Sequence, residues 1–578
     1  MANDDAAGAP AKGPGGRRDL EVAPESSRDP ADEPTVDLGV LESAIGTGAA
    51  LVAEAARRLG DRTGAGVALD DEQVFAYDLA HATAGIATAS AALGYARHGP
   101  LETNLVTAFA ADVLADLVAR TAGREATWGT VAGWHAHLSG LLDLGRSPAF
   151  LAGLAETPGP SHLDADFELV SETFRRFGED RIRPAAEHIH RTNGDIGEEI
   201  IAGLAEMGGF GLSVPEEYGG FAAGGEQDYL AMVVATEELS RCSLGAGGSL
   251  VTRPEILARA LLNGGTEEQK KRLLPAIASG DLMVAIAVTE PDFGSDVANI
   301  AVSATRADGG GWVVNGVKTW CTFAARADLL MLLARTDPDR TRGHKGLSVF
   351  VVDKPRGDGH GFSFVQGPGA GRPGGLPVGK LEGRPIDTIG YRGMHSYEVA
   401  FDSWWVPDGA LVGGEAGLGR GFYLQMAGFE NGRLQTAARA IGLMQAAYEA
   451  ALEYARNRKV FGHPTIEYQL TRAKLGRMAA IIQASRQFSY EVAAMMGRGE
   501  GSMEASMVKA YVCRAAEWAT REAMQIHGGM GYAEEFAVSR LFVDARVLSI
   551  FEGADETLCL KVIARRLADQ AARPATAS

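Results

Sequence analysis

The stretch VTEPDFGSD, residues 288–296, lies where a helical pattern of apolar residues gives way to short apolar runs, and this change indicates the fold. The apolar run at 284–288 predicts a strand, so Thr289 and Ser295 are expected in an exposed loop at the end of that strand. Two hydroxyls beside free main-chain groups suit hydrogen bonding to the edge of a flavin ring or to a diphosphate. By itself, the pattern is also what an ordinary polar β-turn produces.

Closely spaced short apolar runs continue beyond this loop and predict a compact, mainly antiparallel β-domain over residues 284–410. Asn315 and Gly316 are expected to turn the chain after one of these strands. Apolar residues at helical spacing flank the β-domain on both sides, over 160–283 and 415–572, and the second segment is expected to form a four-helix bundle. The predicted fold class is α+β, with a β-barrel or sandwich between two helical domains.

Three more segments carry residues suited to a ring-shaped, phosphate-bearing ligand. In Trp320-Cys321-Thr322, the indole plane could pack beside a fused ring while the hydroxyl bonds its edge, although Trp320 could equally be a core aromatic. Arg458 ends a predicted helix, where a cation is also expected for dipole reasons alone. The glycines at 528–531 permit close approach of the main chain to a ligand, or simply cap a helix.

A carboxylate follows an apolar run near the C-terminus, in Ile550-Phe551-Glu552-Gly553. Apolar surroundings disfavour the charged form of a carboxylate, which makes it a stronger base near neutral pH. A glutamate in this position is more often a solvated helix start, so the pattern alone does not assign a role.

Together and in this order, VTEPDFGSD, QIHGGMGY at 525–532 followed by Arg540 and Asp544, and IFEG resemble the signatures of flavin-dependent acyl-CoA dehydrogenases. The resemblance covers about residues 160 to 570. It implies FAD as cofactor, an acyl-CoA thioester as substrate and electron-transfer flavoprotein as electron acceptor. It also implies that each flavin is shared between two subunits.

The resemblance assigns roles to individual residues. Glu552 becomes the base that removes the α-proton while a hydride leaves the β-carbon for the flavin. Some members carry this base on an earlier helix, directly before an arginine, and here that place is taken by Gly432. The implied FAD contacts are Thr289, Ser295, Trp320 and Thr322 in one subunit and Arg458, Phe461, Gln469, Gln525, Gly528 and Gly529 in its partner. The implied substrate contacts are Glu430, Arg433, Phe551 and Gly553.

Two positions depart from the family pattern. Phe293 stands where a small residue is usual, which leaves the shape of that loop open, and Val460 offers no side-chain hydrogen bond. Glu430 and Arg433 are expected to hold the pantetheine chain and the geometry of the site.

The runs YRGMHSYE at 391–398 and GFENGRLQTA at 428–437, with an extra N-terminal segment, narrow the expected substrate. They resemble the branch of the family that oxidises (2S)-methylsuccinyl-CoA to mesaconyl-CoA in the ethylmalonyl-CoA pathway. The free carboxylate of that substrate needs a cation when it is desolvated, and Arg241 or Arg253 could supply it. The alternatives are an isobutyryl- or glutaryl-CoA type of dehydrogenase, an acyl-CoA oxidase, and a binding protein that keeps the fold without catalysis.

The extra segment, residues 36–157, is rich in alanine and predicts helices that approach closely. Tyr77, Ala80, His81 and Ala84 recur on one narrow face. The hairpin expected at 95–102 resembles the one at 494–504: either two alanine-rich hairpins simply look alike, or the extension copies part of the C-terminal bundle. We expect the extension to pack on the bundle of its own chain and to leave the protein a homodimer.

Composition limits the remaining possibilities. The 578 residues carry a net charge of −19, which argues against nucleic acid as a partner, and 46% hydrophobic residues exclude wholesale disorder. The four cysteines lack metal-ligand or redox spacing, so we expect no metal site, no disulfide framework and a cytoplasmic location. No targeting signal and no membrane-spanning run is expected. Residues 1–35 are expected to be a disordered tail, and residues 573–578 a short C-terminal tail.

Overall fold

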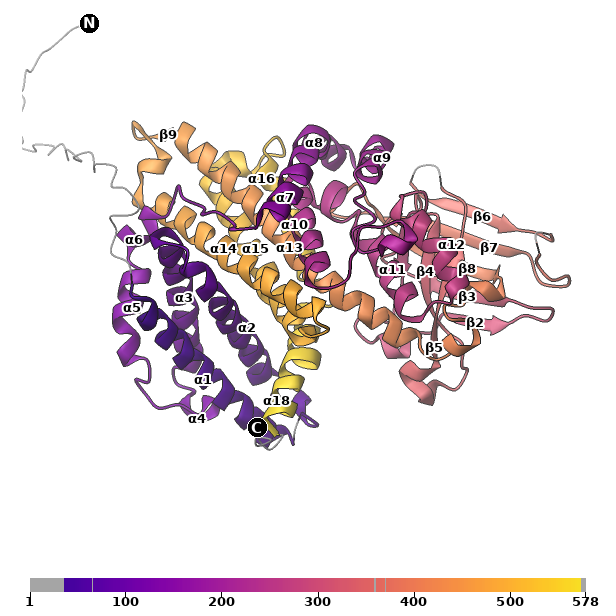
Figure 1. Ribbon diagram of the computed structural model, residues 1–578, viewed down its shortest axis with the longest axis horizontal. Coiled ribbons are helices and arrows are strands. Elements are labelled where there is room, and N and C mark those ends of the chain that lie inside the picture. Colours follow the sequence, from indigo (N-terminus) through magenta and orange to yellow (C-terminus); the bar gives the residue numbers. More distant parts are fainter. Residues whose placement is uncertain (1–35, 65, 358–359, 370, 573–578) are drawn as a thin grey trace, which may run out of the picture.

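A β-sheet stands at one end of the molecule and helices fill the rest, which confirms the predicted α+β class (Figure 1). The computed structural model describes residues 36–64, 66–357, 360–369 and 371–572. The two expected tails, 1–35 and 573–578, lie outside the described residues.

The N-terminal extension is helical throughout. Asp37 caps the first helix by accepting from the Gly39 backbone N–H, and Pro100 stands at the first position of the third, where a missing N–H costs nothing. The helices are α1 (Leu38–Thr63), α2 (Gln73–Ala96), α3 (Pro100–Thr121), α4 (Glu125–Trp128), α5 (Ser139–Gly145) and α6 (Pro148–Gly153), with short 3-10 turns at Leu69–Glu72 and Ala136–Leu138.

One of these helices departs from the expectation that no segment could span a membrane. By length and composition alone, α1 is long and apolar enough to do so. In the structure its apolar face, which includes Leu41, Ile45 and Leu59, is buried against neighbouring helices.

The helical domain before the sheet positions one wall of the site. Its last helix begins with a capping box between Thr266 and Gln269. Its elements are α7 (Ala165–Phe177), η4 (Gly178–Ile182), α8 (Arg183–Thr192), α9 (Glu198–Glu206), η5 (Glu216–Tyr218), α10 (Glu226–Cys242), η6 (Leu244–Gly248), α11 (Thr252–Gly264) and α12 (Glu267–Ala278).

The sheet follows the order β1-β4-β2-β3-β8-β7-β6, with β5 paired on β4. The β1/β4 and β2/β4 pairs are parallel and the others antiparallel. Its strands are β1 (Val284–Ala287), β2 (Ser303–Arg306), β3 (Trp312–Lys318), β4 (Leu329–Arg335), β5 (Leu347–Asp353), β6 (Phe362–Gln366), β7 (Gly379–Ile386) and β8 (Ser396–Val406). The turn expected at Asn315–Gly316 is wrong: β3 runs on to Lys318, and these residues form an irregularity in its pairing with β8.

Long helices form the C-terminal bundle, and α13 packs against α10, α11, α14 and α15. Its elements are α13 (Gly421–Asn457), the hairpin β9 (Lys459–Val460) and β10 (His463–Pro464), α14 (Gln469–Gly497), α15 (Ser502–Ile526), η12 (Gly528–Tyr532), α16 (Ala537–Leu548), α17 (Asp555–Thr557), η13 (Leu558–Ala564) and α18 (Arg565–Ala572). The extension lies on this bundle: α2 contacts α14, α15 and η13, α3 and α6 contact α14, and α1 contacts α18. The expected packing of the extension on its own chain is therefore confirmed.

Candidate active site

Glu552 lies in a tight loop between α16 and α17. Its φ of 56° is in the left-handed region, which is strained for a residue with a side chain, and Gly553 follows with φ 97°. Two contacts hold the loop: the Asp555 backbone N–H donates to Ser549 O at 3.0 Å, and Lys509 Nζ donates to Gly553 O at 2.5 Å. The surrounding structure therefore fixes a conformation that the chain would not adopt alone.

The Glu552 carboxylate faces α13. Only 10% of its side chain is exposed, and its Oε2 is buried without a hydrogen-bond partner among the described residues. A Cβ on Gly432 would lie 2.8 Å from that oxygen. The missing side chain at 432 thus leaves the space that the Glu552 carboxylate fills, and one oxygen is left free to accept a proton.

Two buried arginines meet at Ser249, and one of them lies beside Glu552. Arg439, on α13, is fully buried, and its Nη2 lies 3.9 Å from Glu552 Oε1. Its guanidinium lies 4.8 Å from the centroid of the Phe551 ring, and burial lowers its pKa. Arg253, on α11, donates to the Tyr391 hydroxyl at 2.9 Å, and both arginines donate to Ser249.

Arg439 was missed by the sequence reasoning, because an arginine within a long helix is usually a solvated residue. The signal that could have found it is its place in an otherwise apolar stretch of α13, Ala437-Ala438-Arg439-Ala440-Ile441.

A second carboxylate, Glu255, is buried near Glu552. Burial raises the pKa of Glu255 to about 7, against the effect of Arg259, and the charge of Glu552 adds a smaller contribution in the same direction. Its oxygens accept hydrogen bonds from the amides of Asn431 and Gln435 on α13. This carboxylate therefore couples α11 to the same stretch of α13 that faces the base.

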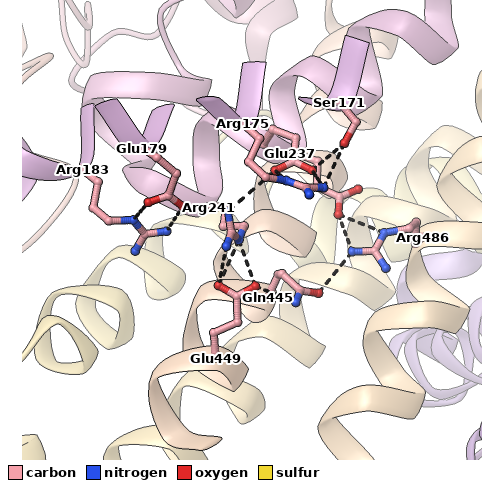
Figure 2. Close-up of polar contacts among 10 residues, drawn as sticks. Ser171, Arg175, Glu179, Arg183, Glu237, Arg241, Gln445, Glu449 and Arg486 are labelled. Atoms are coloured by element: carbon pink, nitrogen blue, oxygen red, sulfur yellow. Dashed lines mark hydrogen bonds and ion pairs between the residues drawn. The ribbon is translucent and has the colours of Figure 1, made fainter. Parts of the chain in front are cut away.

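Arg241 does not reach this cluster. It lies in a network of ions that joins the helical domain to the bundle (Figure 2). Its guanidinium donates to Glu449 at 2.9 Å and to Glu179 at 2.8 Å. Of the two arginines proposed from the sequence, Arg253 shares Ser249 with Arg439, the arginine beside Glu552, whereas Arg241 is engaged elsewhere.

The expected pantetheine residues lie along the same edge of α13. Glu430 accepts a hydrogen bond from Ser502 Oγ at 2.5 Å. Arg433 is buried, donates to Ser506 Oγ at 3.3 Å, and has its pKa lowered by burial. Both residues therefore face the start of α15 and lie within one turn of Gly432.

The four flavin contacts expected in one subunit gather on the loops of the sheet. The Thr319 backbone N–H donates to Thr289 O at 2.8 Å, and the Thr322 and Ser396 hydroxyls lie 2.9 Å apart. Thr557 Oγ donates to Ser295 Oγ at 2.9 Å, which ties this loop to the segment after Glu552. Trp320 is 54% exposed with φ 57°, so a large aromatic surface is held open beside these hydroxyls.

The second set of expected flavin contacts lies elsewhere on the chain. Arg458, Phe461 and Gln469 lie at the β9–β10 hairpin, and stacking of Tyr454 on His527, with centroids 4.2 Å apart, joins that end of α13 to Gln525, Gly528 and Gly529. Phe461 is 93% exposed. Figure 1 shows β9 at the opposite end of the molecule from the sheet.

These residues fit FAD. Exposed aromatic surface at Trp320 and Phe461, hydroxyl donors at Thr289 and Thr322, and the exposed cation of Arg458 match the ring, the polar edge and the diphosphate of that cofactor. Because one chain keeps the two sets apart, a flavin contacted by both would bridge two chains.

Three family models match the chain: the acyl-CoA dehydrogenase N-terminal domain over residues 164–281, the middle domain over 285–404 and the C-terminal domain over 419–568. The chain belongs to the acyl-CoA dehydrogenase family. Members of this family use FAD, and the protein is an FAD-dependent dehydrogenase of acyl-CoA thioesters.

Relatives of this acyl-CoA dehydrogenase differ in substrate. A (2S)-methylsuccinyl-CoA dehydrogenase of Cereibacter sphaeroides is 43% identical over 440 residues, 74% of this chain and 76% of that protein. A mitochondrial 2-methylacyl-CoA dehydrogenase of Solanum tuberosum is 35% identical over 70% of this chain and 91% of that protein. A glutaryl-CoA dehydrogenase solved with glutaryl-CoA is 29% identical, with a TM-score of 0.61 over 70% of this chain and 95% of that one.

Proposed function

We propose that this acyl-CoA dehydrogenase oxidises (2S)-methylsuccinyl-CoA to mesaconyl-CoA, as in the ethylmalonyl-CoA pathway, and passes electrons to electron-transfer flavoprotein. The observation that carries the proposal is a pair of buried arginines, Arg253 and Arg439, which both donate to Ser249, with Arg439 beside Glu552. Among the described residues Arg253 makes no ion pair, and the one carboxylate near Arg439 is Glu552 at 3.9 Å. Such cations are costly to bury, and a dicarboxyl substrate would supply a further carboxylate. The 43% identity to a methylsuccinyl-CoA dehydrogenase supports the same choice.

In this proposal Glu552 acts as the base. Its free Oε2 would take the α-proton, and Gly432 keeps the space for the carboxylate to approach the thioester. Bound FAD would supply the acceptor for the hydride lost from the β-carbon. Buried Tyr391, the arginines and the half-buried Phe551 would exclude water around the acyl chain and strengthen each charge interaction.

We further propose that the working unit is a homodimer in the cytoplasm. Two chains are needed to bring the Thr322 set and the Arg458 set to one flavin. The four cysteines are buried free thiols, as expected of a protein kept in a reducing compartment.

A substrate panel tests the proposed acyl chain. Turnover with an artificial electron acceptor is measured for (2S)-methylsuccinyl-CoA, isobutyryl-CoA, glutaryl-CoA and butyryl-CoA. The highest kcat/KM is expected for methylsuccinyl-CoA, and a preference for any of the others would overturn the proposed substrate but not the dehydrogenase assignment. Rapid reoxidation of the reduced enzyme by air would instead identify an oxidase.

An arginine variant makes the panel specific to the site. Arg439→Met should lower the preference for methylsuccinyl-CoA over butyryl-CoA by about 10- to 100-fold, because a charge-assisted hydrogen bond to the second carboxylate is lost. Arg241→Met is the matched control and should keep the wild-type preference, since Arg241 is held by Glu179 and Glu449.

A further inference from the structure

The N-terminal extension reaches the loop that carries Glu552. Tyr77 and His81, one turn apart on α2, both contact Asp555, three residues after Glu552. Tyr77 donates its hydroxyl proton to Asp555 Oδ2 at 2.5 Å, and His81 Nε2 lies 2.9 Å from the same oxygen. The partners are 478 and 474 residues apart in sequence, so the contact exists only because the extension packs on its own bundle.

This cluster is buried and carries charge. His81 and Asp555 are 5% and 7% exposed, and the two rings of Tyr77 and His81 meet edge to face with centroids 4.7 Å apart. Burial alone would disfavour the Asp555 carboxylate, but the hydrogen bonds from His81 and Tyr77 outweigh it and hold its pKa below the usual value. The three groups therefore form a charged, hydrogen-bonded unit with little freedom to rearrange.

Cys559 completes the surroundings and raises the question of a metal. Its Sγ lies 3.4 Å from His81 Nε2 and 4.0 Å from Asp555 Oδ1. However, Tyr77 and His81 already bond one carboxylate oxygen at hydrogen-bond distances. Burial also raises the pKa of the Cys559 thiol, which opposes the thiolate that a metal requires. The geometry favours a network of hydrogen bonds.

The loop ahead of Asp555 needs such support. Glu552 holds a left-handed φ, and from within the bundle the Asp555–Ser549 backbone bond and the Lys509–Gly553 contact help to fix the loop. We propose that Tyr77 and His81 are positioning residues, which clamp Asp555 and thereby hold the Glu552 carboxylate in line with the substrate α-carbon. This inference rests on the proposed role of Glu552 as the base.

The test measures flavin reduction rather than stability alone. In full-length, FAD-loaded enzyme, the rate of anaerobic flavin reduction at saturating acyl-CoA is compared for wild type, Tyr77→Phe and the double variant Tyr77→Phe/His81→Leu. The substrate is the best one of the panel, with and without α-deuteration. We expect the double variant to reduce its flavin about tenfold more slowly, with unchanged KM and a larger α-deuterium isotope effect, because a displaced base makes proton removal more limiting.

A matched control separates positioning from folding. Tyr95→Phe removes another tyrosine hydroxyl of the extension, one that donates to Pro160 O far from Glu552, and should leave the rate and isotope effect unchanged. Asp555→Asn, which keeps an acceptor oxygen for Tyr77, should lose less rate than Asp555→Leu.

Each other outcome contradicts the clamp. An unchanged isotope effect in the double variant, or an equal loss in Tyr95→Phe, would show a role in folding only. One equivalent of tightly bound metal per chain in wild type, absent from His81→Leu, would replace the clamp with a metal site. If Glu552→Gln stays active, the assignment of Glu552 as the base is wrong. If Glu552→Gln is inactive but the double variant behaves like wild type, only the positioning role of Tyr77 and His81 is wrong.

Discussion

Gly432 and Glu552 meet across the site from α13 and from the loop before α17. A side chain at 432 would collide with the Glu552 carboxylate, so the two positions cannot both carry a base. This contact supports Glu552 as the base in a more direct way than the sequence resemblance does. It also explains why a glycine is tolerated within a long helix, where it normally costs about 1 kcal/mol relative to alanine.

Replacing the base tests this placement. Glu552→Gln keeps the shape of the side chain but cannot accept a proton, so turnover should fall by about 10²- to 10⁴-fold while FAD and acyl-CoA still bind. The measurement is steady-state turnover together with the flavin absorbance and its change on adding acyl-CoA. Glu535→Gln, at an exposed glutamate, serves as the control. Turnover within about tenfold of wild type would show that another group takes the proton.

Glu255 gives a prediction about pH. The folded protein keeps a proton on this carboxyl up to a pKa of about 7, from an ordinary value of 4.5. Between these values the folded state binds more protons than the unfolded chain, so this group lowers stability as pH rises through the window. The loss amounts to about 3 kcal/mol once the carboxyl is ionised.

Glu255→Gln should remove that dependence. Its melting temperature is expected to match wild type near pH 5 and to exceed it near pH 8, when both are followed by differential scanning fluorimetry. An exposed replacement, Glu535→Gln, should follow the wild-type curve at both pH values. If the wild type and Glu255→Gln curves stay parallel from pH 5 to pH 8, the carboxyl does not titrate in this range.

The sequence predicts a role for residues that stand in a local pattern, and it offers no prediction for residues whose position depends on packing. Glu552, Thr289 and Thr322 stand in short signatures. Arg439 has no such signature, since only the fold turns an arginine within α13 toward Phe551. Arg241 and Arg253 flank the same glycine-rich stretch, but packing gives them different partners. Arg241 donates to Glu179 and Glu449, whereas Arg253 donates to the Tyr391 hydroxyl.

Helix α10 is joined to the bundle by charge as well as by apolar contact (Figure 2). Arg241 bridges Glu179 of η4 and Glu449 of α13, and Arg486 of α14 donates to Glu237 of α10 at 2.5 Å. These contacts fix the wall that holds Arg253 and Ser249 relative to α13. Spacing along the chain predicts the helices, but these ion pairs connect residues 62 to 249 positions apart and leave no local pattern.

Breaking one bridge should destabilise the junction without altering the chemistry. Arg241→Met leaves Glu179 and Glu449 without this cation, and the cost is expected to be about 2–3 kcal/mol, since the arginine is largely buried. Thermal melting measures the loss, and kcat per bound flavin should stay at the wild-type value. Arg57→Met removes a solvent-exposed pair with Glu54 and should leave the melting temperature nearly unchanged. A selective loss of kcat with methylsuccinyl-CoA in Arg241→Met would restore this arginine to the substrate site.

Strand β3 shows how pairing overrides a local turn signal. Asn315–Gly316 is a common turn dipeptide, yet the strand continues because β8 pairs with it on both sides of the irregularity. The extended strand carries the chain to Trp320 and Thr322, next to Ser396 of β8. The position of the flavin-facing hydroxyl is therefore set by this long-range pairing.

Over the whole molecule, the hairpin α2–α3 lies against the hairpin α14–α15. Both consist of two long helices joined by a short turn, which supports the interpretation that the extension copies part of the bundle. Helix α6 of the extension also approaches α14 closely, because a Cβ on Gly476 of α14 would lie 1.9 Å from Leu151 O of α6. Because the extension covers these faces of α14 and α15, a second dimer could not dock there to form a tetramer.

The protein is therefore expected to be a homodimer, and its mass in solution should be that of two chains. Light scattering of the full-length protein measures this mass, and a tetramer would refute the blocking role of the extension. Removal of residues 1–155 should uncover the faces of α14 and α15, so the truncated chain is expected to associate further or to aggregate.

Gly476→Val makes the same test within the full chain, because the added methyl groups push the extension off α14. Gly46→Val, at a helical position with open space around it, is the control and should remain dimeric. A truncated protein that stays a soluble dimer would show that other surfaces of the bundle limit assembly.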